Sequence, residues 1–113
     1  MEKQNYYQSP PIIAEVGKLL REALPTGGED AEVHILELDA LRYPLAEAVT
    51  NTMRMLYEKR KQLLWPKDKD VTELDRSIRL NADMAPIERD FALLQKLEVL
   101  LKDRIELCIF FLG

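Results

Sequence analysis

The chain has 113 residues, of which 47% are apolar and 32% charged, and its formal net charge is −4. This composition is typical of one globular domain, and it argues against a disordered chain or a protein whose whole surface binds nucleic acid. The only cysteine is Cys108, so no internal disulfide can form, which favours a reducing compartment. The N-terminus lacks the regions of a signal peptide, and the longest apolar run, 108–112, is too short for a membrane span. We therefore expect a cytoplasmic protein with no membrane contact.

The polar residues 1–9 predict an extended arm, and residues 10–113 a single helical domain. Ser9 followed by two prolines is typical of a helix start, because serine caps helices and proline is tolerated in the first turn. The turn-forming residues 25–28 predict the end of this helix. Its apolar residues recur at steps of three or four, at Ile13, Val16, Leu20 and Leu24.

The segment 31–43 is ambiguous between strand and helix. Val33 and Ile35 alternate as in a strand, and a short strand at 33–38 remains the alternative interpretation. We favour a helix, because residues of one helix face recur at steps of three or four through this segment and beyond it, in a series that we call the ladder. Pro44 interrupts the ladder, so we expect a kink or a helix boundary there. The ladder consists of Ile35, Leu38, Leu41, Leu45, Val49, Thr52 and Leu56.

The helix expected over 44–64 ends at Trp65, because the residue before a proline avoids helical geometry. Its predicted inward positions are Leu45, Val49, Met53, Leu56 and Leu63. A charged loop at 66–70 follows.

Pro86 predicts a further break, after which a long amphipathic helix occupies 87–112. Its inward residues are expected to be Ile87, Phe91, Leu94, Leu97, Leu101, Ile105 and Cys108. Its outer face is expected to carry Glu88, Arg89, Asp90, Gln95, Lys96, Glu98, Lys102, Asp103 and Glu106. The predicted fold is an all-α bundle of four to five helices with this long C-terminal helix. An α+β fold with the strand at 33–38 is the alternative.

No pattern of residues indicates catalysis or a cofactor. His34 is the only histidine and is expected to be partly exposed, while Cys108 lies on an apolar face and is expected in the core. One histidine and one cysteine do not suggest a zinc site, which needs three or four ligands. Two acidic pairs, Glu29 with Glu32 and Asp103 with Glu106, have the spacing found in metal-dependent helical hydrolases. We interpret both pairs as solvent-exposed and expect no catalytic residue, metal or cofactor; a metal-dependent helical hydrolase is the third hypothesis for the function.

Basic residues are concentrated in the segment 54–79, which has eight basic and five acidic residues and a net charge of +3. Cations beside aromatic rings suit single-stranded nucleic acid, because cations bind phosphates and rings stack on bases. An accessory nucleic-acid-binding function is therefore the alternative hypothesis. Its contact residues would be Lys59, Arg60, Lys61, Trp65, Lys67, Lys69, Arg76 and Arg79.

The last turns of the 87–112 helix are apolar nearly all round, whereas a helix on a small monomer usually keeps a polar face. Such a surface needs a cover, either from the domain itself or from another chain. We therefore predict a non-catalytic interaction or assembly subunit that forms a homodimer or binds a protein partner. The predicted interface residues are Leu101, Ile105, Cys108, Ile109, Phe110, Phe111 and Leu112.

Overall fold

The computed structural model describes residues 7–64 and 73–112. This part of the chain forms helices α1 (Ile12–Leu20), α2 (Gly28–Ala40), α3 (Arg42–Leu64) and α4 (Glu73–Leu112), and it contains no strand. The predicted all-α class and long C-terminal helix are thereby confirmed. Residues 33–38 lie within α2, so the helical interpretation of that segment is correct and the alternative strand is wrong.

Helix α1 is shorter at its C-terminal end than the apolar spacing predicts. It begins after Pro11, and the backbone N–H of Ile13 donates to the carbonyl of Pro10 at 3.1 Å. Ser9 does not cap it, because no side chain caps this helix and the Ser9 hydroxyl bonds to α4 instead. Leu24, expected on the apolar stripe, lies exposed in the non-helical segment 21–27.

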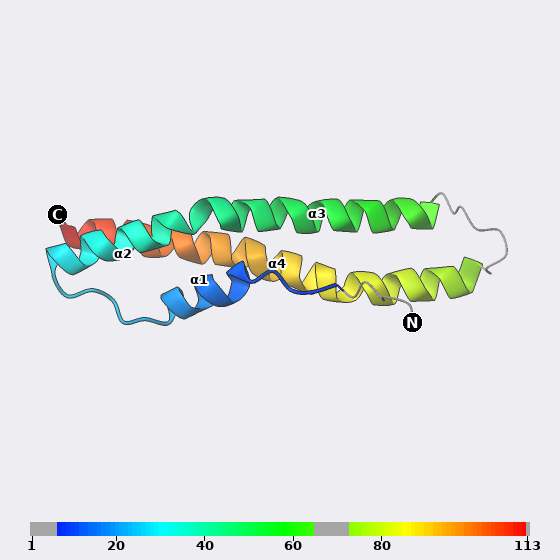
Figure 1. The fold of residues 1–113 in the computed structure, drawn as a ribbon, viewed down its shortest axis with the longest axis horizontal. Helices are drawn as coiled ribbons and strands as arrows, with labels where there is room; N and C mark the ends of the chain where they lie inside the picture. The colour runs from blue at the N-terminus through cyan, green and yellow to red at the C-terminus, as the bar shows by residue number, and fades with distance from the viewer. Residues whose placement is uncertain (1–6, 65–72, 113) are drawn as a thin grey trace, which may run out of the picture.

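Helices α2 and α3 are separated only by Leu41 (Figure 1). Pro44 is the third residue of α3, where the first-turn N–H groups have no helical partner, so the boundary expected near this proline is present. Within α3, Met53 is exposed rather than buried, and Thr52 faces inward. The Thr52 hydroxyl donates to the carbonyl of Ala48 at 2.9 Å, which satisfies this buried polar group. The side chain of Leu63 lies outside the described residues.

Helix α4 runs for 40 residues and passes through Pro86, where a break was expected. Proline costs one backbone hydrogen bond, but Met84, two residues before it, and Ile87, directly after it, are buried against α3. Tertiary packing therefore holds the helix together across the proline. No helix in the described ranges combines the length and apolarity that crossing a membrane requires.

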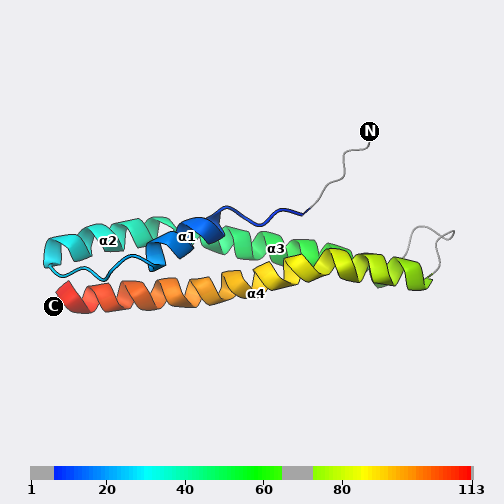
Figure 2. The same cartoon turned by 90° about the horizontal axis from the view of Figure 1, so that it is seen from below.

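The four helices form an elongated molecule with extents of 64 × 30 × 17 Å. Helix α3 packs antiparallel to α4, and α2 continues the line of α3. Helix α1 lies alongside α4 on one face of the molecule and also contacts α3 (Figures 1 and 2). The main core contains Ile12, Val16, Leu38, Leu45, Ala48, Leu94, Leu97, Leu101, Ile105 and Cys108. A second cluster, between α3 and α4, contains Leu56, Met84 and Ile87, with Tyr7 and Phe91 packed against it.

The inward stripe predicted for 87–112 is buried, except that Phe91 is only partly buried. Asp90, predicted for the outer face, is 4% exposed. It lies between Ile87 and Leu94 on the helical period and therefore belongs to the inner face.

Candidate functional site

The predicted interface at the C-terminal end of α4 divides into two groups. Leu101, Ile105 and Cys108 are buried in the main core, so within this chain they hold the helices together. The remaining four predicted residues are exposed, and Phe110 has 77% of its surface exposed. Its ring lies edge-on to that of Phe111, with centroids 6.2 Å apart. Leu107, which was not among the predicted residues, is exposed beside these four, and we call the five together the apolar end: Leu107, Ile109, Phe110, Phe111 and Leu112.

Two cations of the basic segment form ion pairs between α3 and α4. Lys59 Nζ lies 3.8 Å from an oxygen of Asp83, and Arg60 Nη2 lies 3.9 Å from an oxygen of Glu88. These partly exposed pairs contribute little free energy, but they give both cations a partner within the molecule. The exposed Lys61 belongs to α3.

The other predicted nucleic-acid contacts are only partly described. Arg79 is exposed on α4. Trp65, Lys67 and Lys69 lie outside the described residues, as does the side chain of Arg76.

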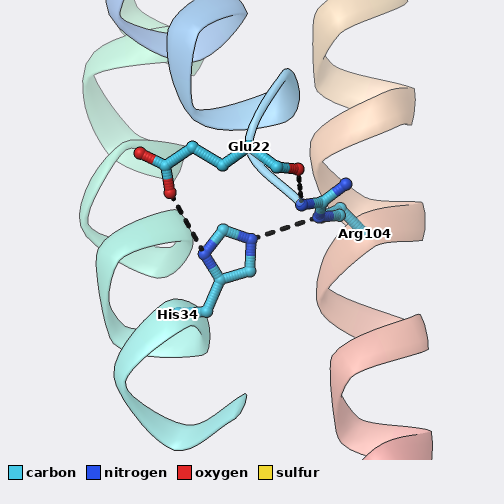
Figure 3. Close-up of polar contacts among 3 residues, drawn as sticks. All are labelled: Glu22, His34 and Arg104. Carbon is cyan, nitrogen blue, oxygen red and sulfur yellow. Dashed lines mark hydrogen bonds and ion pairs between the residues drawn. The ribbon is translucent and has the colours of Figure 1, made fainter. Parts of the chain in front are cut away.

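A polar cluster that sequence reasoning missed lies where the segment after α1 meets α2 and α4 (Figure 3). His34, expected to be partly exposed, is only 7% exposed, because it falls on the same face of α2 as the buried Ala31 and Leu38. The Nε of Arg104 donates to His34 Nε2 at 3.1 Å, and the Nη2 of Arg104 donates to the backbone carbonyl of Glu22. Arg104 thus links α4 to both other elements.

The hydrogen bond from Arg104 fixes which ring nitrogen of neutral His34 carries the hydrogen. Arginine only donates, so Nε2 of His34 must accept and Nδ1 must carry the hydrogen. Nδ1 lies 4.0 Å from Oε2 of Glu22, which is beyond hydrogen-bonding distance. Nδ1 has no hydrogen-bond acceptor within the described part of the chain.

Glu37 completes a group of three potential metal ligands with Glu22 and His34. One ligand atom from each residue lies within 4.8 Å of the other two. A pocket of about 260 Å³ adjoins them, and Asp30 and Val33 also line it. The spacing of His34 and Glu37, one helical turn apart, is visible in the sequence. Glu22 and Arg104 reach the cluster only through the tertiary fold.

The arm is held to α4 by Asp90. The hydroxyls of Tyr7 and Ser9 both donate to the same oxygen of this buried carboxylate, at 2.7 and 2.6 Å. Partial burial of Tyr7, followed by its hydrogen bond to Asp90 and the negative charge of Asp90, raises the pKa of the Tyr7 phenol above its usual value. Tyr7 therefore binds Asp90 as a neutral donor at ordinary pH.

The acidic pairs considered for a hydrolase, Glu29 with Glu32 and Asp103 with Glu106, are all exposed. Neither pair belongs to a group of three potential ligands within the described residues. Comparison with known proteins gives no match to a family model, to a curated protein or to a solved structure.

Proposed function

We propose that this protein is a non-catalytic interaction or assembly subunit that associates with a second copy or a protein partner through the apolar end of α4. The observation that carries the proposal is the exposure of five large apolar side chains on the last two turns of that helix. Contiguous exposed apolar surface on a small protein marks an interaction site more often than scattered single residues do.

The aromatic content of this surface supports the same function. Phenylalanine is enriched at the centres of protein interfaces, where it contributes a large buried area with little loss of side-chain entropy. Phe110 and Phe111 lie side by side there, and Leu112 follows them. The patch is also free of charge, since none of its five members is ionisable.

The test is the molar mass of the full chain, measured by light scattering or sedimentation over a wide concentration range. We expect the native chain to associate. We expect Phe110→Asp to abolish this association, because the substitution would bury a carboxylate in the contact. The fold should remain intact, since Phe110 is 77% exposed. Met53→Asp is the matched control, because Met53 is an exposed apolar residue on α3 away from the apolar end, and this variant should associate normally.

A single-chain mass at all concentrations would remove self-association. A mass that Phe110→Asp leaves unchanged would remove the apolar end as the contact surface. If the occupant is a different protein, we expect capture by the native chain and no capture by the Phe110→Asp variant.

The nucleic-acid hypothesis receives less support from the described residues, because Lys59 and Arg60 have carboxylate partners in the same molecule. It makes a separate prediction. Binding of a single-stranded oligonucleotide would have to weaken steeply with salt, because each phosphate contact releases counterions. Absence of binding at low salt would end that hypothesis.

A further inference from the structure

We propose that Glu22, His34 and Glu37 form a binding site for a divalent transition-metal ion such as Zn²⁺, and that the ion competes with Arg104 for His34. One imidazole and two carboxylates make a donor set that suits such ions. The three ligand atoms already lie within 4.8 Å of one another. Rotation of the exposed Glu22 and Glu37 side chains would bring their oxygens to coordination distance.

The buried side chain of His34 distinguishes this site from an ordinary cluster of surface carboxylates. Its side chain is more than nine-tenths buried, and its Nδ1 points toward the carboxylate of Glu22 (Figure 3). Within the described residues this nitrogen has no hydrogen-bond partner, since its distance to Glu22 is 4.0 Å. Apart from this long contact with Glu22, the buried Nδ1 makes no hydrogen bond, which is unfavourable, and coordination of an ion at this position would satisfy it.

The charges around the pocket favour a cation. Glu22, Asp30 and Glu37 line it, and no lysine or arginine does within the described chain. The neighbouring Arg104 already donates to His34 and to the backbone of Glu22. Three carboxylates around one pocket attract a divalent ion more strongly than a monovalent one.

The competition with Arg104 follows from the imidazole chemistry. A ligating Nδ1 needs its lone pair, so the ring proton must move to Nε2, where it faces the donor Nε of Arg104. No proton is lost overall, because water removes it from Nδ1 and returns one to Nε2. Ion binding therefore breaks the bond between His34 and Arg104. The loaded site would join α2 to the segment after α1 while weakening the link to α4.

The experiment is a calorimetric titration of the full chain with Zn²⁺, compared across variants. We expect one ion per chain, with at least tenfold weaker binding in Glu22→Gln and in Glu37→Gln, which change exposed residues and leave the fold intact. His34→Gln should abolish binding. Glu32→Gln, an exposed acid elsewhere on α2, is the matched control and should bind as the native chain does.

Arg104→Gln tests the competition, because its amide oxygen can accept the proton on Nε2 of His34. We expect this variant to bind Zn²⁺ several-fold more tightly. Weaker or equal binding in a folded Arg104→Gln chain would overturn the competition. Absence of Zn²⁺ binding, or binding that persists in His34→Gln or is lost only in Cys108→Ser, would overturn the site.

Nitrogen-15 NMR gives a second readout, because the chain has one histidine. We expect the proton of His34 on Nδ1 in the metal-free protein and on Nε2 after Zn²⁺ is added. A proton on Nε2 in both states would contradict the exchange, whatever the calorimetry shows.

Discussion

Asp90 and His34 are both buried polar residues that take their partners from distant parts of the chain. Asp90 accepts two hydroxyl hydrogen bonds from the arm, and His34 accepts one from Arg104. Burial of such groups is tolerated only when hydrogen bonds replace those made to water. At the scale of single residues, these contacts hold the arm and α2 against α4.

Replacing Asp90 with alanine removes the acceptor for both arm hydroxyls. We expect the free energy of unfolding to fall by about 1–3 kcal/mol, because two part-buried hydrogen bonds to a charged acceptor are lost. Urea denaturation measures this change. Asp90→Asn should lose less, since its amide oxygen still accepts. Asp103→Ala, at an exposed position on the same helix, should stay within about 0.5 kcal/mol of the native protein.

The ionisation of Tyr7 is expected to make the free energy of unfolding depend on pH in the alkaline range. Burial and Asp90 raise the pKa of Tyr7 in the folded protein above its usual value of about 10. The contribution of the neutral phenol is therefore complete below about pH 10 and is lost as the pH rises toward the folded pKa. We expect Tyr7→Phe to remove this part of the alkaline loss of unfolding free energy. If the free energy of unfolding falls equally steeply with alkaline pH in the native protein and in Tyr7→Phe, the ionisation of Tyr7 is not coupled to folding.

At the scale of elements, α4 is the helix on which the others assemble. It packs against α3, α2 and α1, and it continues unbroken across Pro86 (Figures 1 and 2). A single helix of this kind derives most of its stability from tertiary packing. The ion pairs of Lys59 with Asp83 and Arg60 with Glu88 add contacts on both sides of the proline.

Pro86→Ala should stabilise α4. Alanine restores the missing backbone N–H and removes the clash of the proline ring with the preceding turn, which together cost up to about 3 kcal/mol in a helix interior. We expect a higher free energy of unfolding in urea. A lower value would show that the ring of Pro86, which is partly buried, contributes packing that exceeds the cost of the lost bond.

At the scale of the whole molecule, the shape is a rod, and the apolar end lies at one tip of its 64 Å long axis (Figure 1). Helix α1 packs against α4 and α3 on one long face of the molecule. Association through the apolar end would therefore lengthen the particle, whereas association through a long face would thicken it.

Small-angle scattering distinguishes these arrangements. For a dimer joined at the apolar end, we expect a maximum dimension well above the 64 Å extent of one chain and a longer particle overall. A dimer whose maximum dimension stays near that of one chain would place the contact on a long face instead. Phe110→Asp should return the scattering to that of a single rod.

The helical class, the helix over 33–38 and the buried stripe of α4 could all be predicted from the sequence, because they follow from a local period of 3.6 residues. Local rules were wrong at Ser9 and Pro86, where a distant carboxylate and packing against α3 outweighed capping and proline preferences. The same period places Asp90 and His34 on inner faces, but their partners depend on the folded arrangement, which brings Tyr7 and Ser9 to Asp90 and Arg104 to His34. Those contacts join residues about 70 to 80 positions apart, so no local spacing in the chain encodes them.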